Sequence, residues 1–395
     1  MSYLFESKIN NCIMRKHVLT ILLSFICLIQ LSAQQTLSAK QLIDTLTSVD
    51  FWGRGYTRNG NKKAADFICN YFKKEGLISL AGNEFRQSLS YPVNTFPGNM
   101  ELTLNGIQLK PGIDFIVSPD CKGIKTKGKL EQKDSVTYVD IDHKVIITLK
   151  DKLTFSVATD VTYHTAIEIL KTSVTANPIY YKTSIENKLL NNFKTANICA
   201  MVKGTQKPDS FLVVTAHYDH LGSMGKDTYF PGANDNASGT TLMLGLADYF
   251  VKHPQPYSIA FISFTGEEAG LIGSKYFAEH PLIPLSNIRF LFNLDLEGTG
   301  IEGATVVNAS IYPNEFKILK SINDQFKLLP QLGVRGKAAN SDHYWFTEYG
   351  VPSFFMYTQG GIKAYHDVYD IAATLPMDHY YELLKLLTGF LEEIQ

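Results

Sequence analysis

Five short segments of the chain carry side chains that bind metal ions or move protons. They contain His217 and Asp219, Asp235, Glu267 and Glu268, Asp295, and Tyr365 and His366. Two imidazoles and three carboxylates are the ligands that a pair of zinc ions sharing one bridging carboxylate requires. Such a pair activates water for hydrolysis, and we expect Co²⁺ or Mn²⁺ as substitutes for zinc. Each segment alone is a weak signal, whereas the five together predict a two-metal site.

The spacing within the segments suggests what each side chain does. His217 and Asp219 lie two residues apart at a strand end, so their side chains can share one face. A carboxylate on the second imidazole nitrogen fixes the tautomer, which makes Asp219 an orienting partner for His217. Alone, this pair is more typical of a polar strand exit. Asp235 stands in a Gly-Ala-Asn-Asp-Asn turn, where an isolated aspartate would cap the following helix.

Glu267 and Glu268 close an apolar strand as adjacent acids, a position where glutamates are usually solvated surface charges. A two-metal hydrolase, however, needs one carboxylate on metal and another to take a proton from the water. Two zinc ions bring four positive charges, which Asp235, Glu268, Asp295 and a bridging hydroxide neutralise. Without metal the three acids would repel one another and shift their pKa values.

The elements that position these residues alternate from Thr195 onward. Apolar runs predict buried strands at residues 211–216, 259–264, 290–294 and 351–357. Helical patterns fit residues 239–252, 271–280, 314–326 and 378–394. This alternation predicts an α/β three-layer sandwich with a central, mostly parallel (mixed) sheet flanked by helices. Ligands bind beyond the carboxyl ends of such strands, where His217, Glu267, Glu268 and Asp295 all stand.

The preceding part of the chain has a different character. Residues 36–80 are predicted to be helical, with a clear helical pattern at residues 64–72 that ends near Gly76. Residues 94–192 contain short β-rich pieces, with strands at 144–149 and 178–181 and a helical stretch at 166–170. We interpret residues 94–192 as an inserted subdomain or lid within a catalytic domain formed by residues 34–93 and 193–395. His143 and His164 are interpreted as surface or packing residues.

The N-terminus has the pattern of a secretory signal. A basic start, Met14-Arg15-Lys16-His17, precedes an apolar run of 14 residues, Val18 to Leu31, and then Ser-Ala-Gln. A membrane-spanning helix needs roughly 20 apolar residues, so an uncleaved anchor is the less favoured alternative. We interpret residues 1–33 as an upstream extension and signal peptide, with Met14 as a candidate start. The mature protein is expected to be exported, either periplasmic or extracellular, without stable membrane insertion.

Composition excludes several other classes of protein. Hydrophobic residues make up 45% of the chain and charged residues 19%, which is typical of a globular protein. A formal net charge of −1 and the absence of basic runs argue against nucleic acid as a partner. Beyond the leader, Cys69, Cys121 and Cys199 form no Cys-x-x-Cys pair, so they predict small buried side chains rather than a disulfide framework.

The motifs together resemble the di-zinc exopeptidase family, which includes bacterial leucyl aminopeptidases, aminopeptidase Y-type enzymes and glutamate carboxypeptidase II. The resemblance rests on His217-x-Asp219, Gly-Ala-x-Asp235-Asn-Ala-Ser-Gly, Glu267-Glu268-x-Gly, Asn-x-Asp295 and Tyr365-His366-x-x-x-Asp370. It covers residues 51–395 outside the insertion. It implies that His217 and Asp295 hold one zinc, that Glu268 and His366 hold the other, and that Asp235 bridges them. Glu267 would be the general base, Asp219 the orienting acid and Tyr365 an oxyanion donor.

The chain departs from the family pattern in three places. Where some relatives carry a tyrosine shortly before the Ser341-Asp342-His343 motif, this chain has Lys-Ala-Ala-Asn, so Tyr365 is the expected oxyanion donor, and His343 is expected to line the pocket. After His366 the sequence Asp-Val-Tyr-Asp replaces the Thr-Pro-x-Asp of many relatives. The insertion stands where relatives carry a protease-associated domain, which it resembles only faintly.

The resemblance implies an aminopeptidase that takes peptide substrates, and alternatives remain open. A carboxypeptidase or dipeptidase uses the same metal core, glutaminyl cyclase uses the same fold with one zinc, and some relatives are non-catalytic binding proteins. A serine hydrolase is excluded by the lack of a Gly-x-Ser-x-Gly elbow, and a single-zinc endopeptidase by the lack of His-Glu-x-x-His. The sequence sets neither the preferred terminal residue nor the oligomeric state.

Overall fold

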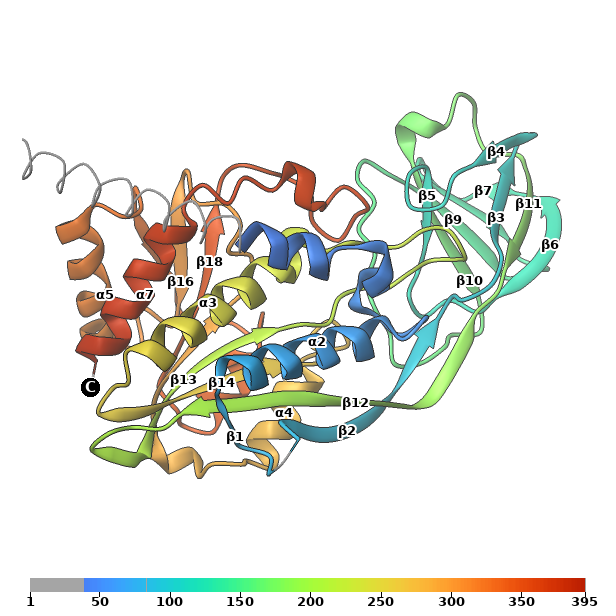
Figure 1. Ribbon diagram of the computed structural model, residues 1–395. Coiled ribbons are helices and arrows are strands. Elements are labelled where there is room, and N and C mark those ends of the chain that lie inside the picture. The colour runs from blue at the N-terminus through green and yellow to red at the C-terminus, as the bar shows by residue number, and fades with distance from the viewer. Residues whose placement is uncertain (1–38, 83, 395) are drawn as a thin grey trace, which may run out of the picture. The chain divides into compact units, whose positions relative to one another are not determined.

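The computed structural model describes residues 39–82 and 84–394 (Figure 1). The predicted leader, residues 1–33, lies outside these described residues. The chain divides into two units, residues 1–42 and 43–395. In the first unit only residues 39–42 are described, and they are helical.

The second unit is built around a nine-stranded sheet with the order β1-β12-β14-β13-β15-β18-β16-β17, in which β2 (Arg86–Thr95) also pairs with β12. Four central strands, β14 (Tyr257–Phe264), β13 (Lys207–His217), β15 (Ile288–Leu294) and β18 (Ser353–Gln359), are parallel to their neighbours in this group. β12 (Lys188–Val202) pairs with β14 antiparallel, and β16 (Gly303–Val307) pairs with β18 antiparallel. β1 (Ile78–Ser79) and β17 (Leu332–Val334) are short edge strands. The predicted mixed, mostly parallel sheet is therefore confirmed.

Helices cover both faces of this sheet. On one face α3 (Gly239–Lys252) packs against β13, β14 and β15, and it contacts both α2 (Gly60–Glu75) and α7 (Tyr380–Glu393). The helix α5 (Pro313–Phe326) packs against α7. On the other face α4 (Ile272–Glu279) contacts α6 (His343–Glu348), and Phe277 and Phe346 from these helices share a core with Val213 and Phe264 of the sheet. The unit is thus a three-layer α/β sandwich.

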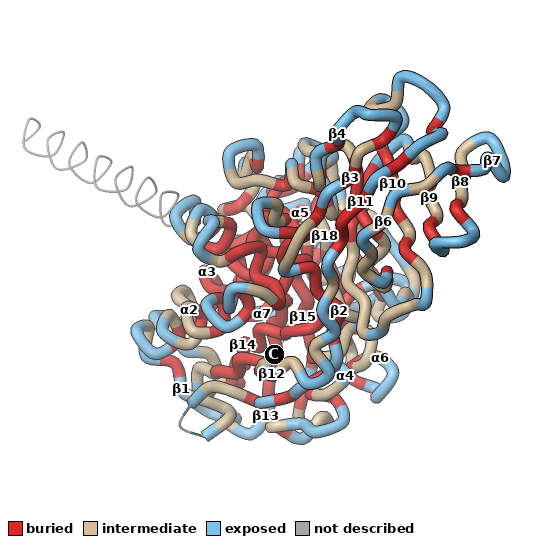
Figure 2. The backbone as a smooth tube through the Cα atoms, turned by 90° about the vertical axis from the view of Figure 1, so that its right-hand side faces the viewer, coloured by how far each residue is buried: buried red, intermediate tan, exposed pale blue. Residues whose placement is uncertain are grey.

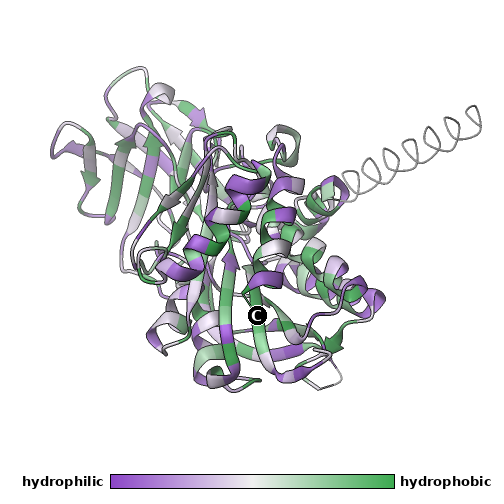
Figure 3. Cartoon of the chain, turned by 90° about the vertical axis from the view of Figure 1, so that its left-hand side faces the viewer, coloured by the Kyte–Doolittle hydropathy of each residue, from purple (hydrophilic) through white to green (hydrophobic). Residues whose placement is uncertain are grey.

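Burial explains why these segments form strands and helices. All eight residues of β14 are buried, because both of its faces are covered, as expected of parallel strands with continuous apolar sequences. Buried residues concentrate in the central sheet (Figure 2), and hydrophobic residues run along its strands (Figure 3). In α2, Ala64, Ile68 and Phe72 are buried at four-residue intervals, and Gly76 ends the helix in a left-handed conformation. Helix α2 accounts for the helical pattern predicted before Gly76.

The helical prediction for residues 36–80 is too broad. A 3₁₀ helix, η1 (Val49–Arg54), and a turn through residues 55–59 separate α2 from the preceding residues. Trp52, Arg54, Arg58 and Asn59 all have positive φ in this segment, which breaks a continuous helix.

Residues 100–185 form two smaller sheets. One has five strands: β5 (Phe115–Val117), β10 (Thr165–Leu170), β9 (Val145–Lys150), β8 (Thr137–Asp140) and β7 (Glu131–Gln132). The other has four: β4 (Ile107–Leu109), β3 (Met100–Leu104), β11 (Tyr180–Ile185) and β6 (Ile124–Lys129). Both contribute to one hydrophobic core. The long strands β2 (Arg86–Thr95) and β12 pair from Thr95–Lys188 to Arg86–Ile198, so this ribbon connects the small sheets to the large one. Because β2 runs to Thr95 and β12 begins at Lys188, the name inserted subdomain is used from here on for residues 96–187 instead of the predicted 94–192.

The helix predicted at residues 166–170 is wrong. This segment is the strand β10, in which Thr165, Ile167 and Ile169 are buried and the residues between them are only partly buried. Burial with a period of two is the pattern of a strand, and the β-branched residues favour it. The segment pairs parallel to β9 and antiparallel to β5.

Cys69, Cys121 and Cys199 are free thiols, and the last two are buried. In the part of the chain that the structure describes, no helix combines the length and apolar character needed to cross a membrane.

Candidate metal centre

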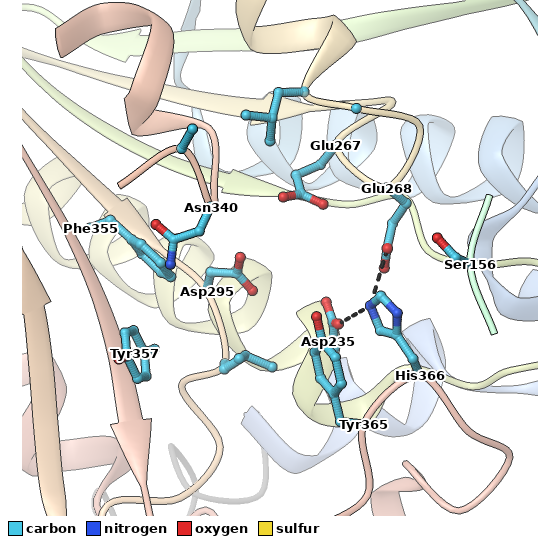
Figure 4. Close-up of a pocket in the computed structure, with 14 residues that line it drawn as sticks. Ser156, Asp235, Glu267, Glu268, Asp295, Asn340, Phe355, Tyr357, Tyr365 and His366 are labelled. Atoms are coloured by element: carbon cyan, nitrogen blue, oxygen red, sulfur yellow. Dashed lines mark ion pairs between the residues drawn. The ribbon is translucent and has the colours of Figure 1, made fainter. Parts of the chain in front are cut away.

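The fold brings the predicted residues to one edge of the sheet. His217 is the last residue of β13, Glu267 and Glu268 follow β14, and Asp295 directly follows β15. Because β13, β14 and β15 are parallel, their carboxyl ends meet at this edge. Two loops complete the set, with Asp235 in the turn η3 (Ala233–Ser238) before α3 and His366 after β18. Figure 4 shows the carboxylates and the His366 ring turned toward one common space.

Asp235 divides the cluster into two half-sites. Its Oδ1 lies 3.4 Å from Nε2 of His217, which in turn lies 3.4 Å from Oδ1 of Asp295. Its Oδ2 lies 3.0 Å from Nε2 of His366, which lies 3.2 Å from Oε2 of Glu268 (Figure 4). We call the His217–Asp295 side the first half-site and the His366–Glu268 side the second. A carboxylate that turns one oxygen to each of two ligand groups has the arrangement needed to bridge two cations.

The donor atoms fit metal ions. Nε2 of His217 and Oδ1 of Asp295 are buried and, among the described residues, make no hydrogen bond. A buried polar atom without a partner is costly, and a cation between the two would satisfy both. The imidazole and carboxylate donors are those that zinc prefers. His217, Glu267 and Asp295 offer ligand atoms that lie within 4.8 Å of one another.

Charges within the cluster shift its pKa values strongly. Burial opposes the charge on His366, but Glu268 and Asp235 raise its pKa to about 11. Burial likewise works against ionisation of Glu268, but His366 and His220 lower the pKa of that carboxyl to about 2. The histidine and the acid therefore hold a proton between them that a metal ion would displace.

A chain of hydrogen bonds from buried side chains fixes the position of the Asp295 carboxylate. Ser341 donates from Oγ to Oδ2 of Asp295 at 2.8 Å, and Asn293 donates from Nδ2 to Oγ of Ser341 at 2.8 Å. Thr215 donates to Oδ1 of Asn293 at 2.6 Å. All four side chains are buried. The second oxygen of Asp295 is thus fixed by protein, while Oδ1 is left for the first half-site.

Asp370 and Arg54 hold the turn that carries Asp235. The carboxylate of Asp370 accepts hydrogen bonds from the backbone N–H groups of Asn234 (2.8 Å) and Asp235 (3.0 Å). The guanidinium of Arg54 is fully buried and donates to five backbone carbonyls, those of Leu46, Tyr218, Pro231, Gly232 and Asp235. One side chain therefore connects the strand end after His217 to the turn before α3.

Asp219 acts differently from the prediction. Nδ1 of His217 lies 3.2 Å from the backbone oxygen of Asp219 but 3.8 Å from its carboxylate. The backbone carbonyl, rather than the side chain, therefore accepts the proton of the imidazole. The carboxylate accepts a hydrogen bond from the backbone N–H of Glu267 at 3.2 Å, so Asp219 positions the turn of the two glutamates.

His220 was not predicted from the sequence. It is fully buried, and its Nδ1 lies 2.7 Å from Oε1 of Glu268, the oxygen that does not face His366. His220 thus fixes the orientation of this carboxylate within the second half-site. A histidine three residues after His217, at the same strand exit, was the available signal.

The cleft beside the cluster has a volume of about 380 Å³. Its wall includes Glu267. Burial raises the pKa of the Glu267 carboxyl well above the usual range, and the nearby acids Glu268, Asp295 and Asp342 raise this pKa further. Tyr365 also lines the cleft, and its ring stacks on His366 with centroids 4.0 Å apart. The uncharged part of the wall comprises Ser156, Gly270, Leu271, Leu296, Ala339, Asn340, Phe355 and Tyr357.

The prediction that His343 lines the pocket is wrong. His343 begins α6, is fully buried and packs against Phe355, with ring centroids 5.3 Å apart. Phe355 faces the cleft in its place, and the cleft wall reaches only Ala339 and Asn340 of the preceding loop.

Comparisons with known proteins agree with the fold and with the motifs. Residues 197–389 match Peptidase family M28, which confirms the resemblance to di-zinc exopeptidases over these residues. Aminopeptidase YwaD of Bacillus subtilis is 36% identical over 127 residues, which are 31% of this chain and 26% of that protein. A probable leucine aminopeptidase of Arthroderma otae is 29% identical over 223 residues, 52% of this chain and 59% of that protein. The matches thus span only part of these relatives.

Solved structures share the fold over a larger part of the chain. The structure of BSAP, a zinc aminopeptidase from Bacillus subtilis, has a TM-score of 0.66 and 19% identity, and covers 90% of this chain and 94% of that chain. A Peptidase M28 precursor from Shewanella amazonensis has a TM-score of 0.67 and 14% identity, with coverages of 90% and 92%. At these identities the similarity establishes the three-layer fold.

Proposed function

We propose that the protein is a zinc-dependent aminopeptidase that uses two zinc ions to remove N-terminal residues from peptides. The observation that carries this proposal is the geometry of Asp235, whose two oxygens face two separate imidazole–carboxylate pairs. The names of the relatives support zinc and aminopeptidase activity as the class of reaction.

Each side chain has a role in this proposal. His217 and Asp295 hold the first zinc, Glu268 and His366 hold the second, and Asp235 bridges the two. Ser341 and His220 orient the carboxylates of the two half-sites from outside, through hydrogen bonds of 2.8 and 2.7 Å. Outer partners of this kind keep metal ligands in place and usually matter for affinity.

The reaction is hydrolysis of the first peptide bond. When bound, the two zinc ions supply Lewis acidity that polarises the carbonyl and acidifies the attacking water. Glu267 lines the cleft, and its role in this proposal is to take a proton from the attacking water and pass it to the leaving amine. The positive charge of the bound metals counteracts the raised pKa of Glu267 and keeps this carboxyl ionised. The hydroxyl of Tyr365 stabilises the oxyanion that forms on the carbonyl oxygen.

The charge of the cleft favours the amino terminus over the carboxyl terminus. Four acidic residues and no lysine or arginine are among the residues that line it. With Asp235, Glu268 and Asp295 bound to zinc, Glu267 is the acid left unbound among the described lining residues, and a C-terminal carboxylate would find no lysine or arginine there. The neutral wall formed by Leu271, Leu296, Phe355 and neighbouring residues fits an uncharged N-terminal side chain.

The substitution Glu267→Gln tests the mechanism. It removes the base while leaving the proposed ligands intact, so the variant should bind two zinc ions per chain and lose turnover about 100-fold or more. Metal content is measured by elemental analysis, which also tests the glutaminyl cyclase alternative, because that enzyme runs on one zinc. Full activity of the Glu267→Gln protein would remove Glu267 from the mechanism. One zinc in the wild-type protein would favour the cyclase.

We further propose that the protein is exported, on the basis of the basic and apolar leader at residues 14–33. Sequencing the N-terminus of the mature protein tests this, with cleavage near Ala33 expected. A mature chain that retains the apolar run would instead indicate an uncleaved anchor.

A further inference from the structure

The ring of His366 is held by the inserted subdomain. Its Nε2 faces Asp235 and Glu268, which leaves Nδ1 as the second hydrogen-bonding atom. Nδ1 lies 3.0 Å from the backbone oxygen of Phe155, 211 residues away in the sequence. The backbone N–H of Phe155 donates in return to the backbone oxygen of His366 at 2.9 Å. Two hydrogen bonds therefore connect one residue of the subdomain to one metal-site residue.

Aromatic packing fixes the position of Phe155. Its side chain is 3% exposed and stacks on Phe230, with ring centroids 4.7 Å apart and planes at 10°. Phe96 meets the same ring edge-on at 6.4 Å. All three belong to one hydrophobic core, which the inserted subdomain forms together with Leu221, Met224 and Phe230 of the catalytic domain. The carbonyl that accepts from His366 is thus attached to a packed core and is not on a free loop.

Further contacts attach the loop of His366 to the same subdomain. Lys152 donates from Nζ to the backbone oxygen of Lys363 at 3.1 Å and lies 3.6 Å from a carboxylate oxygen of Asp367. Val368 packs against the subdomain core. Ser156, next to Phe155, lines the cleft beside Glu268 and His366 (Figure 4). The contact therefore extends along both sides of the metal-site histidine.

We propose that the segment Lys152–Ser156 is a positioning element of the second half-site. Its Phe155 carbonyl keeps the proton of His366 on Nδ1, so Nε2 is free to bind metal in a fixed direction. The inserted subdomain then contributes to metal affinity directly and is not an independent lid over the cleft. This inference rests on the two-zinc site of the proposed function.

A matched pair of substitutions tests the inference. Phe155→Ala removes the ring that anchors the carbonyl. Phe115→Ala removes an equally buried aromatic ring from the same core, and Phe115 makes no hydrogen bond with His366. Zinc binding is measured at buffered free zinc with a competing chelator, and the absorption spectrum of the Co²⁺-loaded protein reports the ligand geometry. Phe155→Ala should keep one tight zinc and bind the second about 10- to 100-fold more weakly. Phe115→Ala should keep both affinities and the wild-type Co²⁺ spectrum.

Two additional variants keep the test decisive if Phe155→Ala does not fold. Phe155→Leu fills most of the space and should restore the second affinity to within a few-fold of wild type. Lys152→Met changes a half-exposed side chain, so it should fold normally and weaken only the second zinc. If either Phe155→Ala or Lys152→Met binds the second zinc as tightly as the wild-type protein does, the inference is overturned. A wild-type protein that binds fewer than two zinc ions would instead overturn the proposed function.

Discussion

Arg54 is expected to be the side chain on which the stability of the metal centre depends most. Its guanidinium is fully buried and donates to five backbone carbonyls over distances of 2.7 to 3.1 Å. Three of these carbonyls belong to residues 231–235, in and just before the turn of Asp235. Arg54→Met keeps much of the apolar stem but removes the charge and every donor.

The size of the effect follows from the contacts. A buried carbonyl that loses its partner costs about 1–3 kcal/mol, and Arg54→Met leaves five of them, a gross loss on the order of 10 kcal/mol. This loss is partly offset, because the wild-type protein bears the cost of burying the charge of Arg54 and the variant does not. Burial lowers the pKa of Arg54 to about 10, which corresponds to about 3 kcal/mol. We therefore expect Arg54→Met to lower the free energy of unfolding by roughly 7 kcal/mol, a large part of the stability of a typical domain.

Urea unfolding at fixed free zinc, followed by tryptophan fluorescence, measures this loss. Arg86→Met is the matched control, because Arg86 forms a partly exposed ion pair with Asp66 at 2.7 Å that should contribute less than about 1 kcal/mol. Arg54→Lys keeps the charge with fewer donors and should fall between wild type and Arg54→Met. If Arg54→Met costs no more than Arg86→Met, the carbonyl cluster does not stabilise the turn and the reasoning is wrong.

Three further predictions concern the metal ligands. Ser341→Ala removes the hydrogen bond to Asp295 and should weaken the first zinc about tenfold in chelator competition, while the second is unchanged. His220→Ala should weaken the second zinc in the same assay, and His220→Asn, which retains a donor near Nδ1, should lose less; equal losses would argue against the bond to Glu268. Because the pKa of His366 is raised to about 11, this histidine carries a proton at neutral pH in the metal-free protein, and zinc must displace it. Zinc affinity should therefore rise with pH between 6 and about 9, with proton release measurable by calorimetry in buffers of different ionisation enthalpy; affinity independent of pH would contradict this assignment.

Local sequence patterns predicted the sheet and the ligands at its edge well. The strands β13, β14, β15 and β18 and the helices α3, α4, α5 and α7 each coincide with an apolar run or a helical period. His217, Glu267, Glu268 and Asp295 converge because parallel strands place their ends at one edge, and two loops add Asp235 and His366. The short strands β16 and β17 and the short helix α6 were not predicted, because segments of three to six residues carry little periodicity.

Contacts between segments that are distant in the sequence could not be predicted from local sequence patterns. Arg54 meets its acceptor at Tyr218 across 164 residues, and Phe155 meets His366 across 211. Both involve backbone carbonyls, which every residue has, so no residue type marks the partner. Asp219 shows the same limit, since the spacing from His217 was correct but the acceptor is its backbone oxygen. His343 is likewise absent from the cleft because it packs against Phe355, and this contact depends on how α6 packs on β18.

The most direct test of the central claim is mass spectrometry of three versions of one peptide incubated with zinc-loaded protein. One version has free ends, one is acetylated at the N-terminus, and one is amidated at the C-terminus; a chelated sample is the control. A two-zinc aminopeptidase should shorten the free and amidated peptides stepwise from the N-terminus, leave the acetylated peptide intact, and do nothing after chelation. Shortening of the acetylated peptide from its C-terminus would contradict aminopeptidase action and favour a carboxypeptidase on the same metal centre.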